Sequence, residues 1–386
     1  MTTGMGTGAN RWKRTHMCGE VTEEWIGREV CLMGWVQRER NLGSLVFVDL
    51  RDREGIVQVV FDQRANAPEV FAVGATLSRE YVLAVRGTVA ARAGAINEKL
   101  PTGRVEVNVA DARLINRAEV PPIYIEDGTE ESEAVRLKYR YLDLRRPSMQ
   151  RTLRMRARVL SAIRRHMDAE GFIDVETPIL TKSTPEGARD FLVPSRIHPG
   201  AFYALPQSPQ IYKQLLMVGG FDKYYQVARC FRDEDNRADR QVEFTQVDME
   251  MSFVEPADIQ RVLEGAYARI FREVLGVELA LPLPRMTWTE AMERYGSDKP
   301  DTRFDMRLVC LDEEAAGCGF KVFEEALAAG GTVRGVRAPG AAGRLTRKEI
   351  DALGEFVKTY RARGLAWALL DADGAARSSF AVSQVG

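Results

Sequence analysis

The sequence has few of the residues from which metal sites and disulfide frameworks are built. Its 386 residues include five cysteines and three histidines, and no two cysteines form a CxxC pair. Neither a zinc site nor a disulfide framework is indicated, so reduced thiols in a cytoplasmic protein are expected. No apolar run reaches membrane-spanning length, and residues 1–14 form a predicted flexible leader without the apolar core of a signal peptide. The formal net charge is −1, so a nucleic-acid site would have to come from local clustering of basic residues.

The rest of the composition is that of a globular protein, with 45% hydrophobic and 28% charged residues. The length predicts two or three domains. Residues 15–118 contain five short apolar stretches separated by turn residues, and a helix is predicted at 68–78 between the third and the fourth. This order predicts an OB-fold β-barrel, an architecture that often binds oligonucleotides. The predicted strands are 29–37, 44–50, 56–61, 81–86 and 104–109.

The second predicted strand places an aromatic residue on its polar side. Phe47 shares a face with Asp49, because side chains alternate along a strand. A base could stack on this ring, and Gln58 on the next strand could read a base edge. The alternative is that Phe47 only plugs the end of the barrel. Three basic residues nearby would follow a phosphate backbone, namely Arg38, Arg40 and Arg51.

Residues 119–146 form a predicted hinge, which leads into a strongly basic helix. Apolar residues recur at helical spacing from Gln150, and Gly171 is the predicted C-terminal cap. The basic face is interpreted as a solvated surface, with contact to RNA or a partner subunit as the alternative. The short strand that follows ends in Pro178, which favours a sheet edge or an interface.

A predicted β-hairpin with a charged loop follows. An apolar strand at 224–228 leads into Phe231-Arg232-Asp233-Glu234, and a second strand covers 244–250. The prediction places the arginine and the glutamate on the first strand and an aromatic residue on the second. Arginine grips phosphate with two parallel hydrogen bonds, and an aromatic ring offers a flat face to a base. A surface hairpin with a solvated charged turn is the alternative.

A helix is predicted to begin at Ser208, shortly before this hairpin. It would carry Lys213 near its N-terminus, where a cation does not stabilise a helix. This placement favours a ligand carboxylate as the partner of the lysine.

Several unbroken strings resemble the class II aminoacyl-tRNA synthetases, and within them the bacterial-type aspartyl-tRNA synthetases. Glu176-Thr177-Pro178 is similar to the first family motif, and 231–250 to the second. The strings that are similar to the aspartyl enzymes are 183–191, 204–210 and 237–241, with 43–55 in the barrel and 139–146 in the hinge. The resemblance implies a multidomain α+β protein with an N-terminal OB-fold barrel and an antiparallel-sheet catalytic domain at 147–298. An α/β insertion domain would begin at 299 and run to 386, with helices at 321–327 and 348–361 and a strand at 365–370.

The resemblance also implies an aspartate–tRNA ligase and its site residues. Arg232 would be catalytic, holding the α-phosphate. ATP would contact Arg232, Asp233, Glu234, Gln241 and Phe244. Aspartate would contact Glu186, Ser208, Gln210, Lys213, Arg232 and Asp248. The anticodon would contact Arg40, Phe47, Gln58 and Glu106, and Pro178 would lie at a homodimer interface. ATP with Mg²⁺, L-aspartate and tRNA(Asp) are the implied ligands, and no metal ligand is assigned within the chain. Whether tRNA(Asn) is also charged stays open.

The third motif of the class, which carries a second ATP-binding arginine, has no counterpart in this sequence. The catalytic and insertion domains are therefore expected to be incomplete, and the chain is expected to be a truncated one that does not aminoacylate by itself. The alternative functions are a non-catalytic remnant that binds tRNA and a sister enzyme for asparagine or lysine. For a lysine substrate an acidic residue, rather than Lys213, would be expected opposite the substrate side chain.

Overall fold

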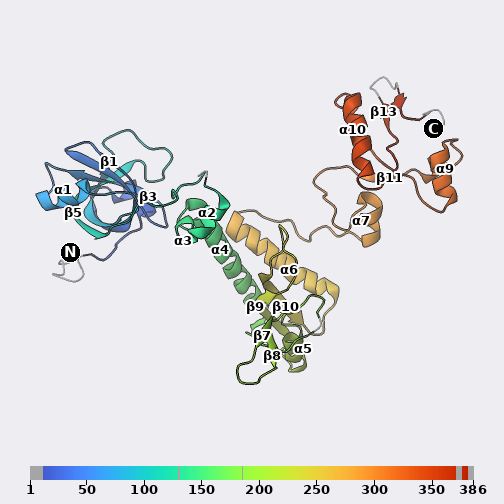
Figure 1. The fold of residues 1–386 in the computed structure, drawn as a ribbon, viewed down its shortest axis with the longest axis horizontal. Coiled ribbons are helices and arrows are strands. Elements are labelled where there is room, and N and C mark those ends of the chain that lie inside the picture. The colour runs from blue at the N-terminus through green and yellow to red at the C-terminus, as the bar shows by residue number, and fades with distance from the viewer. Residues whose placement is uncertain (1–11, 129–130, 185, 371–375, 381–386) are drawn as a thin grey trace. The chain divides into compact units, whose positions relative to one another are not determined.

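The computed structural model describes residues 12–128, 131–184, 186–370 and 376–380. Most of the predicted leader, and one proline in the string 183–191, lie outside these residues. The chain divides into two compact units, Met1–Leu281 and Pro282–Gly386 (Figure 1). Among the described residues, no helix has the length and apolar character needed to cross a membrane. The domain boundaries suggested by the sequence stay predictions.

The N-terminal part of the first unit consists of five strands and one helix. They are β1 (Glu29–Asn41), β2 (Leu45–Arg51), β3 (Ile56–Asp62), α1 (Pro68–Ala75), β4 (Val82–Ala91) and β5 (Val105–Asn116), preceded by the short 3₁₀ turns η1 (Cys18–Glu20) and η2 (Glu23–Trp25). The strands close into a barrel in the order β1-β2-β3-β5-β4, in which only β3 and β5 pair in parallel. Alternate side chains, among them Leu32, Val48, Phe61 and Leu83, fill the interior and are 0% exposed.

The OB-fold prediction is confirmed, but three strands are longer than predicted. β1, β4 and β5 continue beyond the expected ends at 37, 86 and 109. Gly87 explains the difference in β4, because it reads as a strand breaker in sequence. In the structure it lies at a register shift between β4 and β5, where an added Cβ atom would be 2.2 Å from the Asn108 carbonyl oxygen. The glycine permits close approach of two strands instead of ending one.

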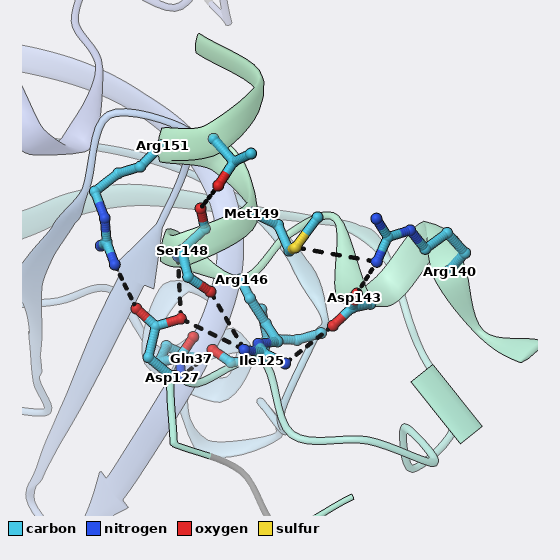
Figure 2. A network of polar contacts seen from close by, with 10 residues as sticks. Gln37, Ile125, Asp127, Arg140, Asp143, Arg146, Ser148, Met149 and Arg151 are labelled. Atoms are coloured by element: carbon cyan, nitrogen blue, oxygen red, sulfur yellow. Dashed lines mark hydrogen bonds and ion pairs between the residues drawn. The ribbon is translucent and has the colours of Figure 1, made fainter. Parts of the chain in front are cut away.

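The hinge contains helices α2 (Glu133–Lys138) and α3 (Arg140–Asp143), which precede the long helix α4 (Pro147–Ala169). Figure 2 shows the polar contacts at the start of α4. Asp127 accepts hydrogen bonds from the Ser148 N–H and from Arg151, both at 3.0 Å. Burial raises the pKa of the Asp127 carboxyl, but these hydrogen bonds outweigh it and hold that pKa below its usual value. The carboxylate thus satisfies a free N–H at the positive end of α4.

The end of α4 agrees with the sequence. Gly171 has a φ of +78°, which a residue without Cβ adopts without strain. The Phe172 N–H donates to the Met167 carbonyl at 3.0 Å, as in a Schellman motif. The predicted glycine cap is confirmed.

The second part of the first unit is a three-stranded sheet with helices on both faces. Its elements are β6 (Ile173–Asp174), β7 (Leu192–Pro194), β8 (Phe202–Ala204), α5 (Gln210–Val218), β9 (Lys223–Phe231), β10 (Glu243–Met251), α6 (Pro256–Ile270) and the π-helical turn η3 (Phe271–Leu275). The sheet order is β10-β9-β6, with β6 parallel to β9, and β7 pairs only with β8 within the described chain. Ile163, Met167, Tyr225 and Val262 form the core between the sheet and helices α4 and α6.

The second unit, described by itself, consists of short helices and two strand pairs. Its elements are α7 (Trp288–Tyr295), β11 (Leu308–Cys310), α8 (Asp312–Ala315), α9 (Lys321–Ala328), β12 (Arg334–Val336), α10 (Arg347–Lys358), β13 (Ala368–Leu370) and β14 (Ala376–Ser378). β11 pairs with β12 and β13 with β14. The helices and strand predicted here are present: α9 is one residue longer than predicted, whereas α10 and β13 are shorter than predicted. α10 begins at a capping box of Thr346 and Glu349, and Arg361 has a φ of +70° beyond its end.

Candidate functional site

One face of the β9–β10 pair carries Phe244, predicted to bind ATP, and Asp248, predicted to bind the amino acid. Side chains alternate along a strand, so every second residue of β10 lies on this face. These residues are Phe244, Gln246, Asp248 and Glu250, and the residues opposite them in β9 are Cys230, Ala228, Gln226 and Tyr224. Tyr225 lies on the other face, in the core with α4 and α6. The sheet therefore has one packed face and one polar face.

Lys213 brings a cation from α5 to this polar face. Its Nζ lies 2.9 Å from Asp248 Oδ1 and 3.5 Å from Glu250 Oε2. The side chains of Lys213 and Asp248 are 11% and 9% exposed, so the pair is shielded from water. One ammonium group facing two carboxylates leaves a net negative charge. Such a site suits a ligand that carries both an ammonium group and a carboxylate.

The segment before α5 brings two further predicted residues together. Ser208 Oγ donates a hydrogen bond to Glu186 Oε2 at 2.7 Å. It also accepts one from the Gln210 N–H at 3.1 Å. The helix therefore begins at Gln210 and not at Ser208 as predicted, because the serine hydroxyl bonds to the N–H two residues ahead.

Two buried glutamines at this site were not singled out from the sequence. Gln207, 2% exposed, donates to the Ala188 carbonyl at 2.8 Å and to Asp190 Oδ1 at 2.6 Å. Gln226, opposite Asp248, accepts hydrogen bonds from the Thr177 N–H at 2.9 Å and hydroxyl at 3.1 Å. Both fix loops that border the polar face, and their partners are distant in the sequence. No local sequence pattern predicts such contacts.

Arg232 lies in the loop after β9, which corrects the prediction that Arg232 and Glu234 lie on the strand. Strand pairing ends at Phe231, opposite Glu243, and the Arg232 N–H then donates to the Val242 carbonyl at 2.9 Å. Its guanidinium carbon lies 5.1 Å from the centroid of the Phe244 ring. Its Nε atom is buried and has no hydrogen-bond partner among the described residues. The predicted phosphate ligand and base platform are therefore adjacent.

The other predicted ATP ligands lie in the exposed loop between β9 and β10. The Asp233 N–H donates to the Arg189 carbonyl at 3.0 Å, and their side chains are 3.7 Å apart. Glu234 is 3.8 Å from Arg240. Gln241 is exposed just before β10. These residues surround the end of the hairpin at which Phe244 lies.

The cysteine on the polar face is Cys230. Burial, together with the nearby Asp248 carboxylate, raises the pKa of Cys230 to about 11. Its Sγ donates to Gln246 Oε1 at 3.2 Å. A thiol is reactive as the thiolate, so a protonated Cys230 does not favour covalent catalysis.

The structure brings together the four residues predicted to read an anticodon. Gln58 Oε1 accepts a hydrogen bond from Arg40 at 3.1 Å, and Gln58 Nε2 donates to Glu106 Oε2 at 2.8 Å. The Arg40 guanidinium carbon is 5.6 Å from the centroid of the Phe47 ring. Phe47 lies outside the barrel core, whereas its neighbours Val46 and Val48 belong to that core. The ring is thus on the outer face and does not plug the barrel.

Two further residues of this outer face were missed as ligand candidates. Arg92, the residue directly after β4, donates to Gln58 Oε1 at 2.7 Å. Burial raises the pKa of Asp49, and the charges of Arg40, Arg92 and Arg38 oppose this shift. Only the closure of the barrel brings Arg92 beside Gln58, so strand periodicity does not reveal it.

Pro178 is exposed, and it is followed by the exposed residues Ile179 and Leu180. The homodimer contact stays a prediction. The described residues contain no group of three or more His, Cys, Asp or Glu side chains that could hold a metal ion. Mg²⁺ in nucleotide sites commonly binds one or two carboxylates together with phosphate oxygens, so the predicted Mg²⁺ also stays a prediction.

The structure thus combines an OB-fold barrel with a sheet whose polar face carries a paired lysine, near an arginine that lies beside an aromatic ring. Comparison with family models identifies both parts. Residues 30–115 match the OB-fold nucleic acid binding domain, and residues 132–365 match the model of tRNA synthetases class II (D, K and N). The second match covers more than half of the chain. The chain therefore belongs to the class II tRNA synthetases of the D, K and N group.

Curated relatives and solved structures give the same family. The chain is 60% identical to aspartate–tRNA(Asp/Asn) ligase of Bacillus cytotoxicus over 94% of its own length, and 58% identical to that of Symbiobacterium thermophilum over 95%. It spans 62% of the length of each of these relatives. Asparaginyl-tRNA synthetase from Pyrococcus horikoshii with asparaginyl-adenylate superposes with a TM-score of 0.60 at 28% identity, covering 69% of this chain and 59% of that one.

Proposed function

We propose that this chain acts as an aspartate–tRNA ligase, which activates L-aspartate with ATP and transfers it to tRNA(Asp). The observation that carries the proposal is the buried Lys213, held by Asp248 and Glu250 on the face that also bears Phe244. A cation among carboxylates matches an amino acid whose side chain is an acid and whose α-amino group is charged. A lysine substrate would place two cations together.

In the first step a carboxylate oxygen of aspartate attacks the α-phosphorus of ATP. A new O–P bond forms, the bond to the bridging oxygen breaks, and pyrophosphate leaves with the electron pair. Arg232 would hold the α-phosphate and stabilise the negative charge that develops on it, and Phe244 would stack on adenine. No protein group needs to form a covalent bond, which agrees with the protonated state of Cys230.

In the second step a hydroxyl of the terminal tRNA ribose attacks the carbonyl carbon of the adenylate. An ester forms, AMP leaves with the bonding electrons, and the hydroxyl proton is released. Base stacking on Phe47, with Arg40, Gln58 and Glu106 at base edges, would hold the anticodon on the barrel. The face is suited to this because its polar groups are already oriented by mutual hydrogen bonds.

A second candidate function is tRNA binding without adenylate formation. The observation that favours it is the contrast between the two sites. Gln58 and Glu106 are hydrogen-bonded on the barrel, whereas Arg232 Nε and Asp248 Oδ2 are buried without partners among the described residues. Binding by the barrel would use groups that are held by hydrogen bonds within the barrel itself.

The test is aspartate-dependent exchange of pyrophosphate into ATP by the purified chain, with tRNA binding measured in parallel. The ligase proposal predicts exchange with aspartate, and not with asparagine or lysine. The expectation from the sequence that this chain does not aminoacylate by itself stays a prediction, and it predicts no exchange. Arg232→Ala should lower the rate by about 100-fold, because it removes charge stabilisation in the transition state. Arg229→Ala is the matched control, since Arg229 is an exposed arginine of β9, 3.4 Å from Glu243, on the face away from Lys213.

Two outcomes separate the candidates. Exchange that equals the Arg232→Ala background, together with salt-sensitive binding of tRNA(Asp), would reject the ligase proposal and favour the binding module. Because the relatives are aspartate–tRNA(Asp/Asn) ligases, tRNA(Asp) and tRNA(Asn) should be compared at the same salt concentration.

A further inference from the structure

The polar face of the sheet contains one completely buried hydroxyl group that the reaction described above does not use. Tyr224 of β9 is 0% exposed and lies directly opposite Glu250 of β10. Asp248 is two residues from Glu250 and therefore on the same face, diagonal to the tyrosine. The phenol ring thus lies on the same face as the two carboxylates that hold Lys213.

Two polar atoms in this group have no visible partner. Lys213 Nζ bonds Asp248 Oδ1 at 2.9 Å, but Asp248 Oδ2 and the Tyr224 hydroxyl are both buried without a hydrogen-bond partner among the described residues. Native proteins rarely leave a buried donor and a buried acceptor unpaired. Burial raises the pKa of Tyr224 well above its ordinary value, and the Asp248 carboxylate raises it further. The hydroxyl is therefore protonated and can act as a hydrogen-bond donor.

We propose that Tyr224 is a positioning residue for the amino-acid half of the site: its hydroxyl donates to Asp248 Oδ2 and orients that carboxylate toward Lys213. The inference rests on the proposed function, since it takes aspartate as the ligand of Lys213. With both oxygens engaged, the carboxylate has one orientation, and the ammonium group stays directed at the side-chain carboxylate of bound aspartate.

Loss of the hydroxyl frees the carboxylate to rotate. Lys213 then has a second acceptor at hand, because Glu250 Oε2 is only 3.5 Å away. A displaced ammonium group weakens the grip on aspartate. ATP should be insensitive, because Phe244 and Arg232 lie at the opposite end of the strand pair, where Phe244 faces Cys230. The effect is specific to one of the two small ligands, which a general loss of packing would not be.

The test compares Tyr224→Phe with Tyr225→Phe. The neighbouring tyrosine is also buried and its hydroxyl donates to Asp168 Oδ1 at 3.2 Å, but on the opposite face of the sheet. Dissociation constants for L-aspartate and for ATP are measured by calorimetry. Tyr224→Phe should weaken aspartate about tenfold, as expected for one hydrogen bond to a charged group, and ATP by less than about twofold. Tyr225→Phe should change the ratio of the two constants by less than about twofold.

A second measurement does not depend on either ligand. A double-mutant cycle on the unfolding equilibrium combines Tyr224→Phe with Asp248→Asn. A hydroxyl that bonds the carboxylate should give a coupling of about fivefold or more in the unfolding constant, whereas separate groups give additive effects. Additive effects overturn the proposal, and so does an aspartate affinity that falls equally in the Tyr225→Phe chain. A wild-type chain that binds neither ligand counts against the proposed function, while the cycle still decides the contact.

Discussion

Two sheet faces of this molecule carry buried polar groups, and they differ in how those groups are hydrogen-bonded. On the barrel, Gln58 is hydrogen-bonded to Arg40, Arg92 and Glu106, so these groups are held before any ligand arrives. At the β9–β10 face, Arg232 Nε is buried without a partner among the described residues, and Asp248 Oδ2 and the Tyr224 hydroxyl have none apart from the contact that we propose between them. The first face is preorganised by its own side chains, whereas the second leaves a buried arginine N–H without a partner.

The difference follows from sheet closure. In the barrel each of the five strands pairs on both sides, so side chains from non-consecutive strands meet at fixed distances. In the described part of the catalytic sheet, β10 pairs only with β9. An open edge leaves backbone groups without strand partners and exposes apolar side chains such as Val247, 42% exposed. Closure therefore stabilises the barrel and fixes the positions of the polar side chains on its outer face.

The largest effect is expected from Phe61→Ala, a substitution in the core of the closed barrel. Phe61 is 0% exposed, and an added Cβ atom on Gly74 would be 2.6 Å from its ring, so α1 lies tightly against it. Removing a buried phenyl ring should lower the free energy of unfolding of the barrel by about 3–5 kcal/mol. Denaturant unfolding followed by tryptophan fluorescence checks this, because Trp25 and Trp35 lie in the barrel and residues 119–281 contain no tryptophan.

The control for that prediction is a substitution beside the three-stranded sheet, which has an open edge among the described residues. Val262→Ala removes a 0% exposed side chain from the core between the sheet and α6. It should leave the barrel transition unchanged, with Trp288 and Trp367 replaced by Phe to silence the second unit. A shift of the barrel transition by Phe61→Ala below about 1 kcal/mol would contradict an autonomous closed core, given the usual cost of such cavities.

A smaller effect is expected on the barrel face itself. Phe47→Ala should weaken binding of tRNA(Asp) by about 1–3 kcal/mol, because stacking of one base on an aromatic ring contributes that much. The slope of the affinity against salt concentration should not change, since no phosphate contact is lost. Filter binding at several salt concentrations measures both quantities. Phe253→Ala, at a phenylalanine that is 98% exposed in the other half, is the control. Equal losses for the two variants would mean that the barrel face is not the binding face.

Local patterns predicted most of the fold, because most elements carry their own signals. Alternation in β2 and β3, apolar spacing in α4 and the glycine at 171 each mark an element from within itself. The place of Arg232 was wrong because a strand end depends on which partner residues remain opposite it, and pairing stops at Phe231. Pairing partners lie in another segment of the chain, so the strand's own sequence does not show its end.

The site residues likewise fall into those with a local sequence signal and those without one. Lys213 stood out because a cation near a helix N-terminus is locally unfavourable. Gln207, Gln226 and Tyr224 did not, since each is a buried polar residue whose role depends on a partner more than fifteen positions away, as in the contact of Gln226 with Thr177. Arg92 belongs to this group as well. Closure of the barrel and packing of loops onto the sheet bring these residues to their sites.

The smallest expected effect is a pH dependence of the stability of the barrel. Burial raises the pKa of Asp49 in the folded barrel, against the opposing charges of Arg40, Arg92 and Arg38. The folded state then holds this proton more tightly than the unfolded chain, so its contribution to stability is complete below the unfolded pKa of about 3.9 and is lost as the pH rises through the folded value. Asp49→Asn keeps the shape and removes this ionisation. Its stability relative to the wild type should therefore increase as the pH rises from about 4 toward neutrality, measured by urea unfolding at several pH values.

Glu69→Gln, which removes an exposed carboxylate from α1 of the same barrel, is the reference. A stability gain for Asp49→Asn that shrinks with rising pH would contradict this prediction. It would show that attraction to the arginines outweighs burial, so that the ionised Asp49 stabilises the barrel face by charge pairing.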